Sequence, residues 1–180
     1  VDVNGDKKVK RTKNRPIASK KISIFYSLLY VVFLCFLAFL ILIQFNLLTI
    51  CLGVGSMIPA FLYPYMKRIT YWPQLFLGFT FNWGIIMAWT ASNGYLSYEI
   101  GVLYLSAIFW TLGYDTIYGV QDIYDDEIIG LKSTAIKFKK NIKEFITMTY
   151  MITILILIYL FRNNMGFNIF TLLFFMFLFN

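Results

Sequence analysis

The chain alternates between long apolar stretches and short connections that hold nearly all of its charge. Six apolar stretches are long enough, or nearly long enough, to cross a bilayer as helices of about 20 residues. They are Ile22–Ile43, Leu47–Met66, Gln74–Ala91, Leu96–Tyr114, Phe145–Phe161 and Met165–Asn180. No stretch shows the sustained period-two alternation of a membrane β-barrel. The pattern predicts an all-α protein, a polytopic bundle of six membrane-spanning helices of which the last two are short.

The charged connections alternate with uncharged ones along the chain. Residues 1–21 hold eight lysines and arginines, residues 67–73 hold two and residues 115–144 hold five, together fifteen of the sixteen in the chain. The connections at 44–46, 92–95 and 162–164 hold only Arg162. Lys and Arg near span ends accumulate on the cytoplasmic side. We therefore expect the three charged connections to face the cytoplasm of a bacterium or, across the inner membrane, the mitochondrial matrix.

Composition narrows the possible chemistry. Hydrophobic residues make up 59% of the chain and charged residues only 14%, against roughly a quarter charged in soluble domains. The basic excess is therefore interpreted as an orientation signal, and no nucleic-acid partner is predicted. The absence of histidine excludes a His acid–base site and a His-containing zinc site. Cys35, Cys51 and the intraspan Asn82 are interpreted as packing residues.

All six aspartates fall in the charged connections, although acidic residues contribute little to membrane orientation. On one helix at 100° per residue, positions 115, 118, 122 and 126 share an arc of roughly 80°. Asp2 and Asp6 are four residues apart and stack in the same way on a helix. Two such rows offer incomplete coordination by hard oxygens, which is how Mg²⁺ is held together with substrate phosphates. The alternative is that these are solvated charges beside the membrane.

Several cations suited to a phosphate lie near these aspartates, namely Lys10, Arg11, Arg15, Lys67, Arg68 and Lys132, with Ser133 and Thr134 following. Taken singly, each cation is better explained as a topology determinant. Arg68 is favoured as a ligand because its planar guanidinium matches a phosphate or carboxylate. A calcium loop is not indicated, because the segment lacks the glycine and closing glutamate of an EF-hand.

Three blocks of the sequence resemble the UbiA superfamily of intramembrane prenyltransferases, and within it the branch that prenylates 4-hydroxybenzoate in ubiquinone biosynthesis. Residues 1–19, VDVNGDKKVKRTKNRPIAS, match the end of an NDxxDxxxD motif and its KRTxNRP continuation. Residues 63–78, YPYMKRITYWPQLFLG, contain the YxxxK pattern as Tyr63 and Lys67. Residues 115–135, DTIYGVQDIYDDEIIGLKSTA, match the second aspartate motif and its KS segment.

The resemblance implies a Mg²⁺-dependent enzyme that transfers a polyprenyl group from polyprenyl diphosphate to an aromatic acceptor such as 4-hydroxybenzoate, within the bilayer. It implies metal ligation by Asp2, Asp6, Asp115, Asp122 and Asp126. Together with the motif spacing, it leads us to expect catalytic roles for Lys67, Arg68 and Tyr118. The expected substrate-binding residues are Arg11, Asn14, Arg15, Tyr63, Lys132 and Ser133.

The resemblance also implies residues that this sequence does not contain. The Asn and first Asp of the first motif would precede Val1, and the family has nine helices, so residues 1–180 are expected to be a partial domain with helices three to eight, inactive alone. Three alternatives stay open: a family member with a naphthoate or haem acceptor, an inactive remnant, and a polytopic transporter. A transporter is expected to carry ionisable residues near the middle of the membrane, where these spans have almost none.

Overall fold

The computed structural model describes residues 12–162, and all regular secondary structure in that range is helical. The helices are α2 (Ile24–Leu42), α3 (Leu47–Gly55), α4 (Met57–Ile69), α5 (Pro73–Phe81), α6 (Trp83–Asn93), α7 (Tyr98–Val120), α8 (Ile123–Ile129), α9 (Thr134–Lys137) and α10 (Ile142–Phe161). Within the described range, five segments are long and apolar enough to cross a membrane: 24–42, 47–69, 73–93, 98–120 and 142–161. The all-α class is confirmed, and these five segments overlap the first five predicted spans. The predicted span Met165–Asn180 lies outside the described residues.

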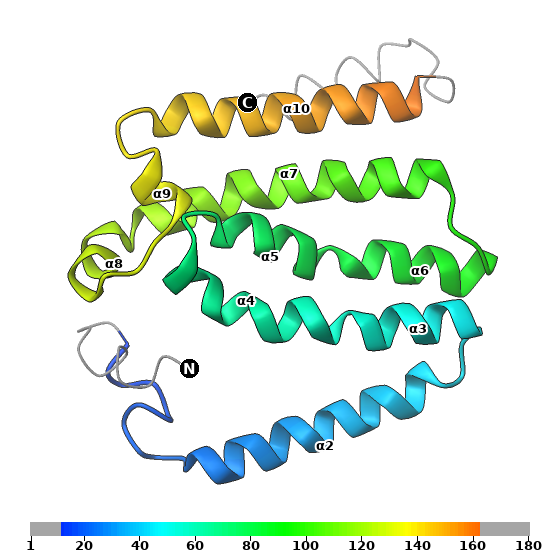
Figure 1. Ribbon diagram of the computed structural model, residues 1–180, viewed down its shortest axis with the longest axis horizontal. Helices are drawn as coiled ribbons and strands as arrows, with labels where there is room; N and C mark the ends of the chain where they lie inside the picture. Colours follow the sequence, from blue (N-terminus) through cyan, green and yellow to red (C-terminus); the bar gives the residue numbers. More distant parts are fainter. Residues whose placement is uncertain (1–11, 163–180) are drawn as a thin grey trace.

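The long helical segments lie side by side in one row, and successive segments are antiparallel (Figure 1). Helix α7 lies between α10 on one side and the α5–α6 pair on the other, and the α3–α4 pair follows. Helix α2 forms the far edge of the row, packs mainly against α3 and has no buried residue. The row is therefore tightly packed around α7 and open at α2.

Two of the spans are interrupted, which the apolar pattern had not predicted. The first breaks at Ser56 between α3 and α4, where Pro59 has no N–H to donate to the carbonyl of Gly55. The second breaks at Asn82 between α5 and α6. The Asn82 amide nitrogen donates to the Gly78 carbonyl at 2.9 Å and, across to α7, to the Thr111 hydroxyl at 2.7 Å. The interpretation of Asn82 as a helix–helix contact is confirmed.

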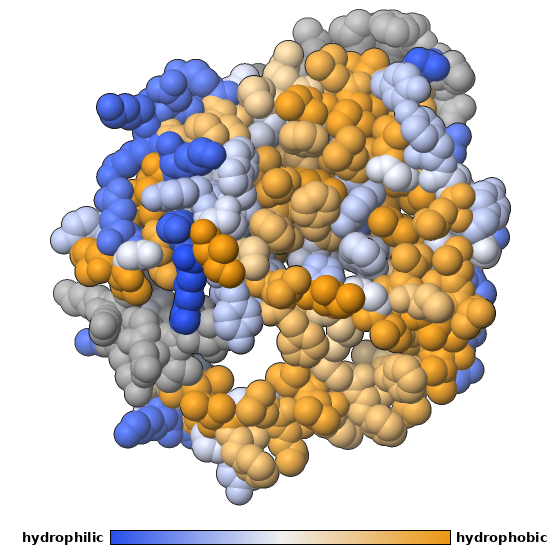
Figure 2. All heavy atoms as spheres, viewed as in Figure 1, coloured by the Kyte–Doolittle hydropathy of each residue, from blue (hydrophilic) through white to orange (hydrophobic). Residues whose placement is uncertain are grey.

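Small polar side chains fill the helix interfaces. Thr49 and Thr90 join α3 to α6 near one end of the bundle, with their hydroxyl oxygens 3.0 Å apart. Thr116 and Thr134 join α7 to α9 near the other end, with their hydroxyl oxygens 2.6 Å apart. Such residues let membrane helices approach closely and hydrogen-bond. The outer surface is correspondingly apolar, and hydrophilic residues gather toward the ends of the bundle (Figure 2).

Candidate functional site

The candidate site lies at the end of the bundle where α4 and α7 terminate and where α8 and α9 are found (Figure 1). Lys67 and Arg68 occupy the last turn of α4, where cations interact favourably with the helix dipole. Helix α7 ends at Val120, and Asp122 is the residue before α8. Helix α8 ends at Ile129 and is capped by Gly130, whose φ of 78° is left-handed.

The break between α7 and α8 corrects the assumption of one continuous helix from residue 115 to residue 126. The amides of Gln121 and Asp122 bond to carbonyls three residues back, at 3.2 Å each. These short turns end α7, and a new helix begins at Ile123. The 80° arc therefore does not carry across the turn, and Asp126 belongs to a separate helix from Asp115.

Lys67 is at the centre of the charged residues that the structure brings together. Its ammonium nitrogen lies 3.8 Å from the Asp126 carboxylate, with side chains 38% and 10% exposed respectively. The positive charge of Lys67 also attracts the Asp115 carboxylate, and the negative charge of Asp122 repels it. One lysine from α4 thus interacts with carboxylates from both α7 and α8.

A second lysine is fixed beside the first by the backbone. The amide of Lys132 donates to the carbonyl of Lys67 at 2.7 Å, and the Lys132 ammonium donates to the carbonyl of Ile69 at 3.2 Å. The same ammonium lies 5.5 Å from the ring centroid of Tyr71, within range of a cation–π interaction. The end of α4 and the segment before α9 are therefore held together at both lysines.

A buried polar residue that the sequence had not singled out lies behind these lysines. Gln74, at the start of α5, is 3% exposed, and its side-chain oxygen accepts from the amide of Thr134 at 3.0 Å. A glutamine directly after a proline at the start of an apolar span is a polar signal in the sequence. Its partner could not be identified there, because Thr134 is sixty residues away.

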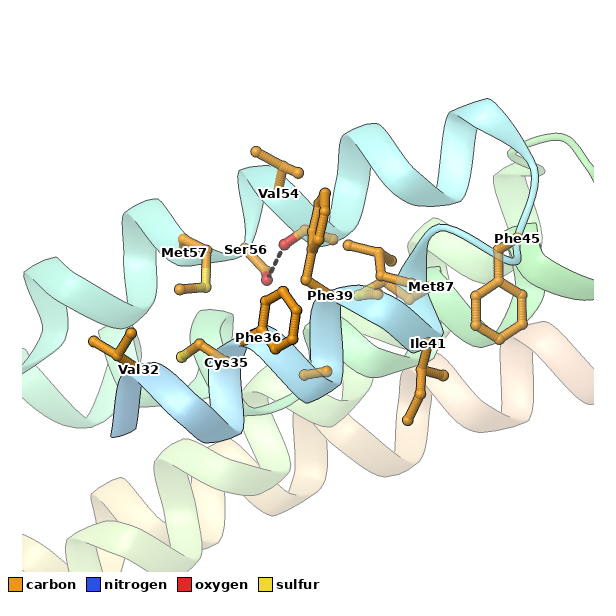
Figure 3. A pocket seen from close by; sticks show the side chains of 13 residues that line it. Val32, Cys35, Phe36, Phe39, Ile41, Phe45, Val54, Ser56, Met57 and Met87 are labelled. Carbon is orange, nitrogen blue, oxygen red and sulfur yellow. Dashed lines mark hydrogen bonds between the residues drawn. The ribbon is translucent and has the colours of Figure 1, made fainter. Parts of the chain in front are cut away.

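An apolar cavity of about 730 Å³ separates α2 from α3, α4 and α6 (Figure 3). Phe36, Phe39 and Cys35 line it from α2, and Met57 and Met87 face them. The one hydroxyl in the wall, that of Ser56, donates to the Gly53 carbonyl at 2.6 Å. Figure 2 shows an opening beside α2 in the space-filling view. The cavity offers an apolar chain a binding place of ordinary ligand-pocket size.

The whole sequence, residues 1–180, matches the UbiA prenyltransferase family. The chain belongs to this family. It is 48% identical over 147 residues to the human mitochondrial 4-hydroxybenzoate polyprenyltransferase, covering 81% of this chain and 40% of that protein. It is 46% identical, also over 147 residues, to 4-hydroxybenzoate geranyltransferase 1 of Lithospermum erythrorhizon, covering 81% of this chain and 48% of that protein. The chain thus spans between two fifths and one half of these relatives' length.

A solved structure of a UbiA homologue from Aeropyrum pernix K1 has the same fold. The TM-score is 0.78 at 23% sequence identity, covering 92% of this chain and 64% of that one. At this identity the likeness establishes the arrangement of helices alone. The helical class of this UbiA family member is thereby established.

The remaining predicted site residues differ in their burial. Tyr63 is one turn before Lys67 on α4 and half-buried, while Arg68 is exposed. Tyr118 is 65% exposed and packs edge-on against Tyr114 with ring centroids 6.3 Å apart. Ser133 is 1% exposed, and its hydroxyl caps α9 by accepting from the amide of Ile136 at 3.2 Å.

The amino-terminal residues of the predicted site divide between described and undescribed parts of the chain. Asn14 and Arg15 are exposed and lie in the turns between residues 12 and 22. Asp2, Asp6 and Arg11 lie outside the described residues.

The carboxylates present fit a magnesium ion in their chemistry. Within residues 12–162, no three His, Cys, Asp or Glu side chains gather into a ready-made metal site. Mg²⁺ usually takes only one or two protein carboxylates and completes its shell with water and substrate phosphates. The interacting pair Asp115 and Asp122 provides that number, whereas Asp126 is engaged with Lys67.

Proposed function

We propose that the complete protein is an integral membrane prenyltransferase that moves a polyprenyl group from its diphosphate to an aromatic acid of the 4-hydroxybenzoate type. The observation that carries the proposal is the charged group around Lys67, which places two lysines and three aspartates at one end of a UbiA-family bundle. Cations and carboxylates together suit a phosphate bound through a metal. The names of the relatives supply the acceptor.

The donor is proposed to lie with its diphosphate at Lys67 and its tail in the apolar cavity. Met57, in the cavity wall, is ten residues before Lys67 on α4, which is about 15 Å along a helix axis. A donor that has its diphosphate at Lys67 and its tail in the cavity therefore needs a long chain. The apolar wall of the cavity requires that chain to be apolar, as a polyprenyl group is.

In the proposed reaction the allylic C–O bond breaks and its electron pair leaves with the diphosphate. A C–C bond then forms at the ring carbon beside the acceptor hydroxyl, and that carbon loses its proton. Asp115 and Asp122 would hold Mg²⁺, which would supply positive charge at the diphosphate. Lys67 and Lys132 donate to the diphosphate oxygens, whose charge grows as the bond breaks, so they stabilise the transition state more than the ground state.

The two arginines are proposed to bind different anionic groups. Arg68 follows Lys67 in the last turn of α4 and is assigned to the diphosphate. Arg15, on the segment that precedes α2, is assigned to the carboxylate of the aromatic acid. In both cases the planar guanidinium offers two parallel hydrogen bonds that an ammonium group does not.

The test is prenyl transfer by the full-length protein in membranes. Radiolabelled 4-hydroxybenzoate and a polyprenyl diphosphate are supplied with Mg²⁺ or with a chelator, and the prenylated product is extracted and counted. We expect product only with Mg²⁺, and none from a Lys67→Met variant that is present in the same amount. Transfer to a naphthoate but not to 4-hydroxybenzoate would reassign the acceptor, and no transfer to any aromatic acceptor would indicate an inactive remnant.

A further inference from the structure

Three buried side chains form a hydrogen-bonded connection behind the two lysines. Gln74 of α5, Thr116 of α7 and Thr134 of α9 are 3%, 0% and 0% exposed. The Gln74 side-chain oxygen accepts from the Thr134 amide at 3.0 Å, and the Thr134 and Thr116 hydroxyl oxygens are 2.6 Å apart. Buried polar groups that are fully paired hold their elements in one arrangement. Three helices are joined at Thr134.

The direction of each hydrogen bond follows from the atoms available. Thr116 donates its only hydroxyl proton to the Leu112 carbonyl at 2.6 Å. The Thr134 hydroxyl is therefore the donor to Thr116, since each hydroxyl carries a single proton. The Thr134 amide and the two threonine hydroxyls thus each have an acceptor, and removing Gln74 or the Thr116 hydroxyl would leave a buried group of Thr134 without its partner.

Thr134 lies two residues after Lys132, and the intervening residue Ser133 is 1% exposed. The backbone over this short distance transmits the position of Thr134 to Lys132, whose amide is bonded to the Lys67 carbonyl at 2.7 Å. Gln74 itself touches neither lysine side chain in any hydrogen bond of the described residues. Its effect on the charged group therefore passes through residues 132–134.

We propose that Gln74 and Thr116 are positioning residues, which fix the spacing of Lys67 and Lys132 by anchoring Thr134 against α5 and α7. The inference rests on the proposed function, because it takes the two lysines as the receptors of a diphosphate. A diphosphate needs its cations at fixed separation, and small displacements of such groups are costly for binding and reaction.

The structure contains a matched control at the opposite end of the bundle. Thr90 accepts from the Thr49 hydroxyl at 3.0 Å and donates to the Met87 carbonyl at 3.1 Å. Thr116 makes the same two kinds of bond, and both threonines are fully buried. Thr116→Val and Thr90→Val therefore remove equivalent hydroxyls from two helix interfaces, of which only one adjoins the lysines.

The experiment measures binding of inorganic diphosphate in the presence of Mg²⁺ to the purified full-length protein and its variants. We expect Gln74→Leu and Thr116→Val to weaken binding by about tenfold, the lower end of the range for residues that support a binding group indirectly. Thr116→Ser, which keeps the hydroxyl, and Thr90→Val are expected to bind within about twofold of the unaltered protein. Binding by Gln74→Leu at the unaltered affinity would overturn the proposal, as would an equal loss in Thr90→Val or the failure of the unaltered protein to bind diphosphate.

Hydrogen exchange followed by mass spectrometry gives a second readout that does not depend on activity. Amide protection over residues 130–136 is expected to fall in Gln74→Leu and Thr116→Val and to persist in Thr90→Val. Unchanged protection in Gln74→Leu would show that the segment does not depend on this anchor and would reject the inference. A protein that binds diphosphate in this anchor-dependent way but transfers no prenyl group would keep the inference and reject the proposed reaction.

Discussion

At the scale of single residues, two adjacent carboxylates occupy opposite environments. Asp126 is buried, and its carboxylate is 3.8 Å from the Lys67 ammonium. Glu127 is on the outside of α8, where it pairs with Lys139 at 3.0 Å with side chains 42% and 55% exposed. An exposed ion pair of this kind contributes little, since both groups remain solvated. Asp126 by contrast holds the central lysine of the site.

The first prediction compares these two neighbours. Asp126→Asn removes the negative charge that orients Lys67, and we expect the rate of prenyl transfer to fall by about 10- to 100-fold. Glu127→Gln is expected to leave the rate within about threefold, because it disrupts only a solvated pair. The measurement is initial rate per amount of enzyme in the same membranes. Equal losses for the two variants would mean that α8 as a whole, and not Asp126, supports the site.

The sequence predicted the members of the site better than their partners. Asp126, Lys67 and Lys132 were identified from motif spacing, and the structure brings all three together. Their pairing could not be predicted, because it depends on the short turn at Gln121 and Asp122 that separates α7 from α8. Gln74 was missed because a lone polar residue in an apolar span has no local partner that reveals its role.

At the scale of secondary structure, α5 and α7 approach one another at a glycine. A Cβ atom on Gly78 would meet the side chain of Ile108 at 3.0 Å and its backbone carbonyl oxygen at 3.1 Å. A backbone atom cannot move aside as a side chain can, so the two helices would have to separate. This contact lies on the interface that also carries Asn82 and Thr111.

The second prediction tests this close approach by thermal unfolding in detergent. Gly78→Ala is expected to destabilise the protein by about 1–3 kcal/mol, the usual cost of overpacking. The control is Gly84→Ala on α6, because a Cβ there would meet nothing within 4 Å. Alanine favours helix over glycine, so this variant should unfold at the same temperature or slightly higher. A normal unfolding temperature for Gly78→Ala would contradict the packing of α5 on α7.

The third prediction uses the two native cysteines, which lie on neighbouring helices. Cys35 lines the cavity from α2, whereas Cys51 of α3 does not contribute to its wall. Both side chains are exposed. A long-chain polyprenyl diphosphate in the cavity should slow alkylation of Cys35 by a membrane-permeant maleimide and leave Cys51 unaffected. Equal protection of the two thiols, or protection of neither, would place the prenyl chain elsewhere.

At this scale the sequence predicts the spans but not the breaks within them. The five described spans were predicted from continuous apolar runs, and their ends agree within six residues. The breaks at Ser56 and Asn82 were not predicted, because apolar residues continue on both sides of each break. The break in the helix at Asn82 is stabilised by hydrogen bonds to α7, which form only when the two helices pack together.

At the scale of the molecule, the bundle has one strongly charged end. Among the described residues, lysines from the segment before α2, from the end of α4 and from residues 132–143 all lie there, and Arg162 lies at the opposite end of α10. The described parts of the three predicted charged connections thus share one face in the structure. The candidate site lies on this face.

The fourth prediction assigns that face to the cytoplasm or the matrix. In a full-length protein with its native cysteines replaced by alanine, single cysteines are introduced at Lys13, Lys139 and Ser92. An impermeant maleimide applied to intact cells or mitoplasts should label Ser92→Cys and reach Lys13→Cys and Lys139→Cys only after the membrane is opened. External labelling at Lys13 or Lys139 would reverse the orientation and place the site on the other side.

The unequal burial of the spans has a consequence for biosynthesis. Helix α2 is the most apolar of the five spans and has no buried residue, so it can leave the translocon for lipid without a partner. Residues 73–93 and 98–120 are the least apolar, yet they share the Asn82 bond to Thr111 and a 2.6 Å bond from the Tyr104 hydroxyl to the Phe79 carbonyl. These two spans are therefore suited to enter the bilayer together as a hairpin, after the ribosome has delivered both.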